Sequence, residues 1–404
     1  MKISLIQPGR NNLKYLKWSY DSIRKNQGSH EVEICVADDF SNDGTWDWCQ
    51  DMMDADSNFK AIRNEGPTRL GHTILYDRLV NEVASHDVCM IYHADMYLMP
   101  GAIDQIEHKL KEKTIVSLTR IEPPLHPAGP EKMLMDFGIE PEEFREQELL
   151  DWFKEVQLTQ STKITEGIFA PWAFYKKDFQ EIGGHDPLYA PQSKEDSDIF
   201  NRFQLNGIKF IQTWGGCVYH MTCRGSRFAD GATRNPNGEV FMKNRETEEW
   251  LTQNAKATRE FIRKWGHFVK HDSLLKPIII PKYDVGLIIK NTNLDLLRAI
   301  EPWCSNIYCD EQFTVGRYAD YVEMEDTSFD LYEKFKPLDN EKQNGILIEI
   351  DGTTFNNEDF RFIQNFAEII ANDKELDIGT FQLGNLQITI LSLETYENEL
   401  IVCK

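Results

Sequence analysis

The order of hydrophobic segments in the first half of the chain predicts an α/β fold with a doubly wound, mostly parallel sheet. Short apolar runs of strand length alternate there with longer stretches of helical periodicity. Two of the apolar runs end in acidic residues, Asp38 with Asp39 and then Asp95. Ligands bind beyond the carboxyl ends of the strands in such sheets, so we expect the functional site at this edge.

The same pattern predicts the individual elements of a first domain, residues 1–272. Strands are expected over 2–7, 32–37 and 88–92, and helices over 13–26, 45–53, 74–83, 141–156 and 246–265, with a helix starting at 193. The Pro-rich stretch 121–129 is expected to be irregular, as part of an insertion or lid. A polar, proline-bracketed stretch near 270–280 marks the domain boundary.

Residues 273–404 are predicted to form a smaller accessory α/β domain. Strands are expected over 284–290 and 345–351, helices over 294–303 and 358–371, and one or two more strands over 381–393. No catalytic constellation is evident in this part of the sequence. Acceptor recognition, formation of a homo-oligomer and recruitment of a partner all stay open as roles.

Charge and composition limit the classes of partner. The 404 residues carry a net charge of −22, which disfavours nucleic acids and anionic membranes as partners of the whole surface. No apolar run approaches the roughly 20 residues of a transmembrane helix, and the N-terminal run is too short for a signal peptide. The eight cysteines form no CxxC pair, so neither disulfides nor a zinc site are indicated. We expect a soluble, cytoplasmic protein.

Five segments carry residue types suited to chemistry at the strand ends. They are 7–12 (QPGRNN), 36–45 (VADDFSNDGT), 92–96 (YHADM), 183–186 (GGHD) with 195–202 (EDSDIFNR), and 218–220 (VYH) with 225–228 (GSRF). In this order and spacing they resemble the motifs of family-two glycosyltransferases of the GT-A fold. The resemblance covers about residues 1–270 and includes 261–266 (FIRKWG). It implies a Rossmann-like nucleotide-binding domain that transfers sugar with inversion.

The resemblance implies a metal site for the donor diphosphate. Asp95 matches the last acid of the family's DxD motif, and His220 matches its late histidine, so both are expected to bind Mn²⁺ or Mg²⁺. His93 replaces the first acid of the motif and cannot supply its negative charge. A histidine packed against Tyr219 and Trp214 is the alternative interpretation of His220.

The donor nucleotide is expected at the ends of the first strands. The resemblance implies that Asp38 or Asp39, with Asp39 favoured, accepts the imide N–H of uracil or thymine in a UDP- or dTDP-sugar. Turn-shaping acids are the alternative. The remaining candidates are Pro8, Gly9 and Arg10 on the opposite wall, and Arg69, His93 and Ala94.

Inverting transfer needs a base on the acceptor side, because the attacking hydroxyl loses its proton. The resemblance assigns this role to Asp196, whose acidic neighbours Glu195 and Asp198 favour a raised pKa. Ordinary first-turn acids of a helix are the alternative. Arg202 is expected to pair with one of these acids.

The acceptor site is expected around the GGHD motif. The candidates are Gly184, His185, Asp186 and Glu195, with Trp172 either stacking on a sugar ring or packing in the core. Arg224 and Arg227 follow His220 in a loop suited to the departing diphosphate.

The combined prediction is a metal-dependent glycosyltransferase that uses a nucleotide-sugar donor. The acceptor hydroxyl belongs to a glycan, a lipid-linked sugar or a protein, and the residues do not distinguish these. Two alternatives stay open: a nucleotidyltransferase acting on a sugar phosphate, and a non-catalytic sugar- or nucleotide-binding assembly protein.

Overall fold

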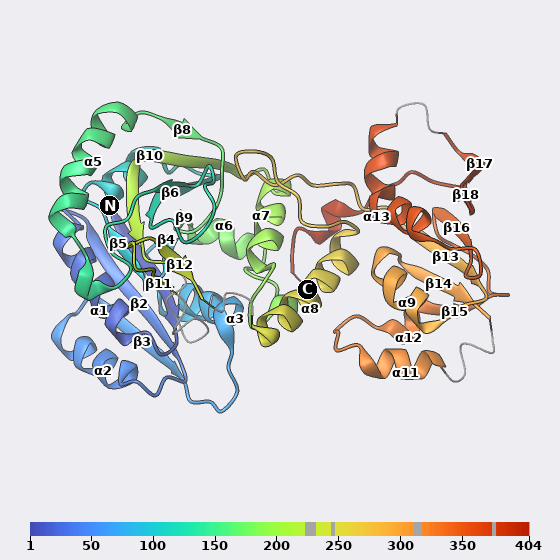
Figure 1. Ribbon diagram of the computed structural model, residues 1–404, viewed down its shortest axis with the longest axis horizontal. Coiled ribbons are helices and arrows are strands. Elements are labelled where there is room, and N and C mark those ends of the chain that lie inside the picture. The colour runs from blue at the N-terminus through green and yellow to red at the C-terminus, as the bar shows by residue number, and fades with distance from the viewer. Residues whose placement is uncertain (223–231, 244–246, 311–316, 374–376, 404) are drawn as a thin grey trace. The chain divides into compact units, whose positions relative to one another are not determined.

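The computed structural model describes residues 1–222, 232–243, 247–310, 317–373 and 377–403 (Figure 1). By internal contacts the chain divides into two compact units. Unit 1 comprises Met1–Leu251, His271–Pro277 and Val402–Lys404, and unit 2 comprises Thr252–Lys270 and Ile278–Ile401. Most of helix α8 (Glu248–Trp265) therefore packs with the second unit. The domain boundary at 272/273 stays a prediction.

Unit 1 is built on one large sheet with a parallel core, as predicted. Its main strand order is β3 (Phe59–Asn64), β2 (Glu31–Asp39), β1 (Lys2–Gly9), β4 (Val88–Ile91), β9 (Trp172–Tyr175), β6 (Thr114–Glu122), β10 (Lys209–His220) and β5 (Met96–Leu98). Short strands β7 (Lys132–Leu134) and β8 (Ile164–Thr165) join β6 and β10. The first four strands pair in parallel, whereas β9 and β5 run antiparallel to their neighbours.

Strand β1 is the switch point of this sheet, because the chain continues to β2 and β3 on one side and returns to β4 on the other. The predicted helices follow each strand as α1 (Leu13–Asn26), α2 (Thr45–Ala55) and α3 (Gly71–Arg78), the last extended by η1 (Leu79–Val83). Nearly all residues of β1 and β2 are buried, as expected for strands covered on both faces. The carboxyl ends of β1, β2 and β4 thus meet at one edge.

The stretch 121–129 differs from the prediction at its start. Ile121 and Glu122 continue β6, because Ile121 pairs with Tyr219 of β10 and Glu122 pairs with Leu134 of β7. Local composition favoured irregular structure, but partners from distant strands supply the backbone hydrogen bonds. The predicted acidic helix is present as η2 (Pro141–Glu143) and α5 (Glu146–Gln160).

The remaining elements of unit 1 place the acceptor-side motifs. They are α4 (Ala102–Lys109), α6 (Lys176–Glu181), η3 (Pro187–Tyr189), α7 (Glu195–Leu205), β11 (Ala232–Arg234) and β12 (Val240–Met242). Arg202 of α7 is fully buried and pairs with Asp198 at 2.8 Å, which confirms its expected pairing. Its other two nitrogens donate to the carbonyls of Ile182 and Gly184, at 2.9 and 2.6 Å. Arg202 therefore connects the turn at Gly183 and Gly184 to α7, the helix that carries Asp196.

The substitution Arg202→Leu is expected to lower the free energy of unfolding by about 3 kcal/mol, because it leaves the Asp198 carboxylate buried without its partner. Chemical denaturation of the two proteins measures the difference. Arg78→Leu, at an exposed pair with Glu82, is the control and should change stability by less than about 1 kcal/mol. Equal effects of both substitutions would contradict a structural role for the buried pair.

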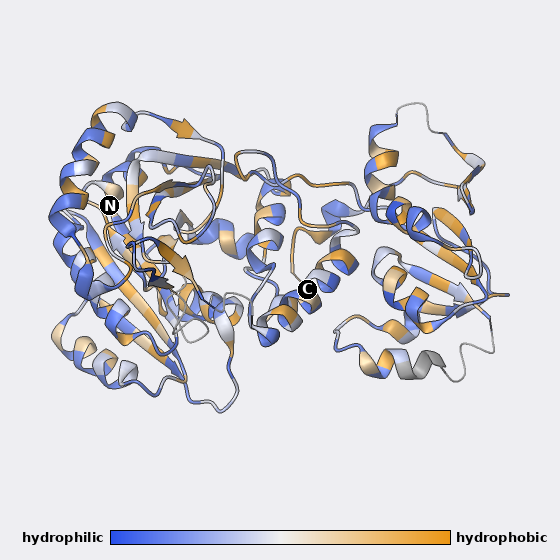
Figure 2. Ribbon diagram, viewed as in Figure 1, coloured by the Kyte–Doolittle hydropathy of each residue, from blue (hydrophilic) through white to orange (hydrophobic). Residues whose placement is uncertain are grey.

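Unit 2 has its own sheet and core, which confirms the predicted second α/β region. Its strand order is β15 (Phe335–Pro337), β14 (Asn306–Cys309), β13 (Val285–Lys290), β16 (Ile346–Asp351), β18 (Leu386–Ile390) and β17 (Gly379–Leu383). Its other elements are α9 (Leu294–Ile300), η4 (Glu301–Trp303), α11 (Arg317–Met324), α12 (Leu331–Lys334), α13 (Asn357–Asn372) and η5 (Glu397–Leu400). Figure 2 shows hydrophobic residues running along the strands of both units.

Among the described residues, none of the helices combines the length and the apolar character needed to cross a bilayer.

Candidate active site

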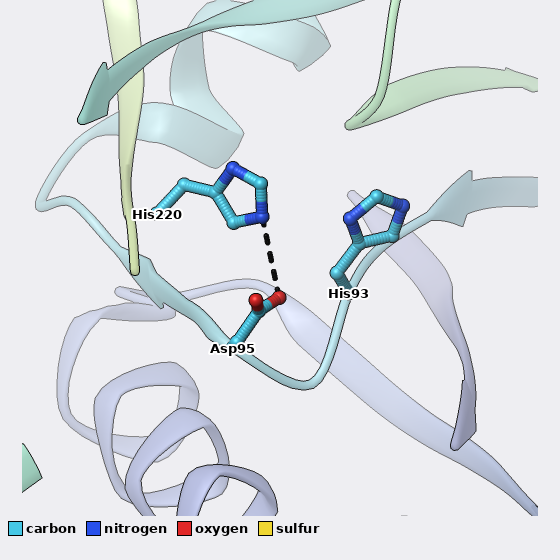
Figure 3. Close-up of side chains that lie close together, drawn as sticks. All are labelled: His93, Asp95 and His220. Atoms are coloured by element: carbon cyan, nitrogen blue, oxygen red, sulfur yellow. Dashed lines mark ion pairs between the residues drawn. The ribbon is translucent and has the colours of Figure 1, made fainter. Parts of the chain in front are cut away.

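Three side chains from two neighbouring segments form a compact cluster at the end of the unit 1 sheet. His93 and Asp95 lie in the turn between β4 and β5, and His220 is the last residue of β10. Because His220 pairs with Met96 across the β5–β10 ladder, the register brings Asp95 beside it. The possible ligand atoms of the three residues all lie within 4.8 Å of one another. Figure 3 shows the Asp95 carboxylate facing His220, with the His93 ring alongside.

A second carboxylate stands behind this cluster. Glu122 Oε1 lies 2.7 Å from His220 Nδ1, and Lys132 and Arg120 also contact the Glu122 carboxylate. Burial opposes its charge, but these partners hold the pKa of Glu122 well below its usual range. A carboxylate behind a ligating histidine orients the ring and strengthens it as a ligand. Sequence reasoning missed Glu122, because it was expected in an irregular segment.

The cluster fits a divalent cation. His220 Nε2 is buried without a hydrogen-bond partner, 3.3 Å from Asp95 Oδ1, so its available position faces a carboxylate. Burial and then the charge of His220 lower the pKa of His93 to about 3, which leaves a neutral imidazole with a lone pair. Burial disfavours protonation of His220, but Asp95 and Glu122 raise its pKa to about 9. Two imidazoles with one carboxylate suit Mn²⁺ better than Mg²⁺.

The nucleoside candidates lie at the ends of β1 and β2, where Gly9 pairs with Asp38. Asp38 is fully buried, and Oδ1 accepts the backbone N–H of Ser41 at 3.1 Å. Its Oδ2 lies 3.4 Å from Arg63 Nε, but neither atom has a hydrogen-bond partner. Burial raises the pKa of Asp38 despite these contacts. Asp38 therefore retains acceptor capacity at the strand end.

Asp39 is occupied by the neighbouring loop. Its two oxygens accept the backbone N–H groups of Leu70 and Gly71, at 3.0 and 2.9 Å, and the side-chain amide of Asn64 at 2.8 Å. Arg69 Nε lies 3.6 Å away. A carboxylate has about four acceptor positions. Asp39 thus uses most of these acceptor positions to hold the start of α3. Sequence reasoning missed this role, and it also missed the contacts of Asn64 and Arg63 with the two aspartates.

The opposite wall contains the other donor candidates. Pro8 pairs with Ala37 within the sheet, and Arg10 Nε is buried without a hydrogen-bond partner. Ala94 is buried between His93 and Asp95. The side-chain amide of Gln7 donates to the His93 carbonyl at 3.5 Å, which links the end of β1 to the turn that carries His93 and Asp95. Arg10 thus offers a cation to a phosphate at the end of β1.

On the acceptor side, the GGHD motif forms a tight turn that depends on glycine. Gly184 has φ +71°, and a Cβ there would lie 2.0 Å from Asp77 Oδ2. The adjacent His185 donates its backbone N–H to Asp77, and its Nδ1 lies 2.7 Å from Asp77 Oδ1. The His185 ring is stacked on Tyr76, and its Nε2 is buried without a hydrogen-bond partner. Asp186 accepts from the N–H of Leu188 and starts η3.

Glu195 and Asp196 form the first turn of α7. The two residues before them, Ser193 and Lys194, both have positive φ, of 86° and 72°. Such backbone is costly for residues other than glycine and often occurs at functional sites. Glu195 is buried, and loss of hydration together with the charge of Asp196 raises its pKa.

Asp196 itself is exposed to solvent. The dense surrounding protein still raises the pKa of its carboxyl, whereas the electrostatic influence of His185 and Arg120 lowers it. An exposed carboxylate with a raised pKa is suited to accept a proton from a bound hydroxyl.

Tyr76 connects the two sides of the site. Burial, and then the negative charges of Asp196, Glu195 and Asp95, raise its pKa well above the usual value. The candidate base Asp196 and the candidate metal ligand Asp95 thus both raise the pKa of the same phenol. Arg120 similarly influences both Asp196 and His93. Neither Tyr76 nor Arg120 lies in a recognised motif, so local sequence carried no signal for them.

The remaining predicted residues are Trp172, Arg224 and Arg227. Trp172 is fully buried against Phe174, Phe200 and Phe203, so the idea that it stacks on a sugar ring is wrong and it belongs to the core. Arg224 and Arg227 lie outside the described residues.

Comparison with known proteins gives a family-model match for the first part of the chain. Residues 4–183 match the family model described as Glycosyl transferase family 2. A search of curated proteins gave no match. Among solved structures, GalNAc-T7 with UDP, GalNAc and Mn²⁺ is 13% identical, with a TM-score of 0.44 over 66% of this chain and 51% of that one. The mannosyltransferase PcManGT from Pyrobaculum calidifontis, in complex with GDP-Man and Mn²⁺, is 15% identical, with a TM-score of 0.43 over 69% and 67%. The chain therefore spans about half the length of GalNAc-T7.

Proposed function

Because residues 4–183 match the model of glycosyl transferase family 2, we propose that the chain transfers a sugar from a nucleotide-sugar donor to a hydroxyl acceptor, with inversion. The observation that carries this proposal is the cluster of His93, Asp95 and His220, whose possible ligand atoms lie within 4.8 Å of one another, together with the exposed Asp196 carboxylate in the first turn of α7. A cation site for the diphosphate and a carboxylate for the acceptor are the two groups that inverting transfer needs. Asp95, His220 and the neutral His93 would hold Mn²⁺ or Mg²⁺.

The proposed reaction is a direct displacement. The acceptor oxygen attacks the anomeric carbon as the bond from that carbon to the diphosphate oxygen breaks, and Asp196 takes the acceptor proton. A bound cation would neutralise the departing diphosphate. Arg10, which follows β1, would contribute a further positive charge.

We further propose that Asp38, rather than Asp39, contacts the nucleoside base. Asp39 is bound by two backbone N–H groups and one side-chain amide, whereas Asp38 has one oxygen without a hydrogen-bond partner. A buried carboxylate acceptor suits the imide N–H of uracil or thymine, which supports a UDP- or dTDP-linked donor.

A thermal-shift panel tests the proposed function directly. Nucleotide-sugars, nucleotides and buffer are compared with and without Mn²⁺ and after EDTA. We expect stabilisation by one class of nucleotide-sugar that increases with Mn²⁺, followed by transfer or slow hydrolysis of that donor. Release of pyrophosphate from a nucleoside triphosphate would instead identify a nucleotidyltransferase, and binding without turnover would identify a non-catalytic protein.

His185 provides a pH test of the acceptor side. The electrostatic influence of His185 lowers the pKa of Asp196, so His185→Phe is expected to raise this pKa. The base works only when ionised, and the acid limb of the kcat/KM profile should therefore move to higher pH. Phenylalanine preserves the ring stacked on Tyr76. A profile that changes in height without moving along the pH axis would show that His185 contributes packing alone.

A further inference from the structure

Unit 2 repeats the strand arrangement that forms the candidate donor site in unit 1. Its strands β15, β14, β13 and β16 are neighbours in the same order as β3, β2, β1 and β4, and all of these pairs are parallel. Strand β13 therefore occupies the position that β1 has in unit 1. The carboxyl ends of β13 and β16 form a second switch point, where an open α/β sheet is suited to bind a ligand.

A crevice of about 250 Å³ lies at this second switch point. Its walls come from the segments that follow β13 and β16, and its lining consists of Asn293, Asp295, Leu296, Ala299, Gly352, Phe355, Asn356, Asn357 and Phe360. Gly352 permits the two segments to approach, because a Cβ there would lie 2.3 Å from the Asn291 carbonyl oxygen. Thr292, which precedes the lining residue Asn293 in the chain, has a buried hydroxyl without a hydrogen-bond partner.

The lining favours one class of ligand. Its polar groups are amides and one carboxylate, and none of its lining residues is a lysine or arginine, so phosphate has no cation to bind. The Phe355 and Phe360 rings remain partly exposed beside these groups. Sugar hydroxyls both donate and accept hydrogen bonds, and the apolar face of a sugar ring packs on aromatic side chains.

Two of the amides are already held in place. Asn293 Oδ1 accepts from the N–H of Leu296 at 2.9 Å, and Asn356 Oδ1 accepts from the N–H of Glu358 at 2.7 Å. With each oxygen fixed, the corresponding NH₂ group has a restricted orientation and binds a hydroxyl at a lower entropic cost. The volume is below the roughly 300–1,000 Å³ of sites for drug-sized ligands. It suits one residue of a longer saccharide.

We propose that this crevice is an accessory binding site for a neutral saccharide. Its lining residues all belong to unit 2, whereas the metal cluster and Asp196 belong to unit 1, and its occupation requires neither metal nor catalysis. The class of ligand follows from the side chains of unit 2 and does not depend on the function proposed for unit 1.

Binding to the full chain tests the proposal. Saturation-transfer NMR is recorded with a panel of neutral oligosaccharides, and with UDP and inorganic phosphate, on Asp196→Asn protein kept free of metal with EDTA. We expect at least one oligosaccharide to bind, and Phe355→Ala and Asn357→Ala each to weaken its binding about tenfold or more. Tyr332→Ala, an exposed aromatic of unit 2 outside the lining, is the matched control and should leave binding unchanged. Thermal unfolding of each variant verifies that it is folded, and Asn357, which is exposed, tests the site without disturbing the core.

Three results would overturn the proposal: no saccharide of the panel binds, binding is the same in both crevice variants, or phosphate and UDP compete for the crevice. A loss of transfer activity in unit 1 variants with unchanged saccharide binding would affect only the function proposed for unit 1. The two proposals therefore fail independently.

Discussion

The Asp196→Asn substitution is expected to reduce the rate of sugar transfer by about 10²–10⁴-fold while donor binding stays unchanged. Asparagine preserves the size of the side chain but cannot accept the proton of the acceptor hydroxyl. The effect should appear in kcat, because Asp196 acts on the acceptor during the chemical step. The measurement is steady-state transfer, together with thermal shift of the donor complex.

The neighbouring acid supplies the control for this experiment. Burial and the charge of Asp196 raise the pKa of Glu195, so the protonated form is favoured and Glu195→Gln imitates it. We expect this variant to retain most of its activity. The pKa of Asp196 is also raised, so wild-type activity should decline on acidification at a higher pH than for an ordinary aspartate. Normal transfer by Asp196→Asn would show that another group is the base.

The Asp95→Asn substitution is expected to weaken Mn²⁺ binding by at least about 100-fold and to abolish transfer at metal concentrations that saturate the wild type. Asp95 is the one carboxylate among the three clustered side chains, and the other two are imidazoles. Its removal takes away the negative charge that attracts the cation. Electron paramagnetic resonance of free Mn²⁺ measures binding, and activity after EDTA treatment measures the requirement.

Glu122→Gln provides a graded comparison for Asp95→Asn. Glutamine can still accept a hydrogen bond from His220 Nδ1, but it lacks the charge behind the ring. We expect a loss of Mn²⁺ affinity of about 10-fold, smaller than for Asp95→Asn. If Asp95→Asn bound Mn²⁺ like the wild type, the assignment of the metal site would be wrong.

Much of the architecture followed from local pattern. The predicted helix over residues 13–26 has the bounds observed for α1, and the strand that ends at Asp38 and Asp39 is β2. These predictions succeed because helical and strand periodicities are properties of neighbouring residues. The strands β6 and β9 were not predicted, because their hydrogen-bond partners come from distant segments.

The candidate site likewise combines features that the local sequence predicts with features that depend on distant residues. From the sequence by itself came the α/β class, the acids at the strand ends and the order of motifs that placed Asp95, Asp196 and His220. Only the tertiary structure decided which of these groups remain available to a ligand. Glu122 lies behind His220 from 98 residues away, and Asp77 holds His185 from 108 residues away.

Long-range contacts also involve two of the predicted residues. The backbone of Leu70 and Gly71 occupies Asp39, and three phenylalanines cover Trp172. In unit 2, no motif marked the crevice at the second switch point, which exists because β13 and β16 are neighbours in the sheet. The sequence thus determined which chemical groups are present. Burial and hydrogen-bond partners, which depend on residues far apart in the chain, decided which of them can act.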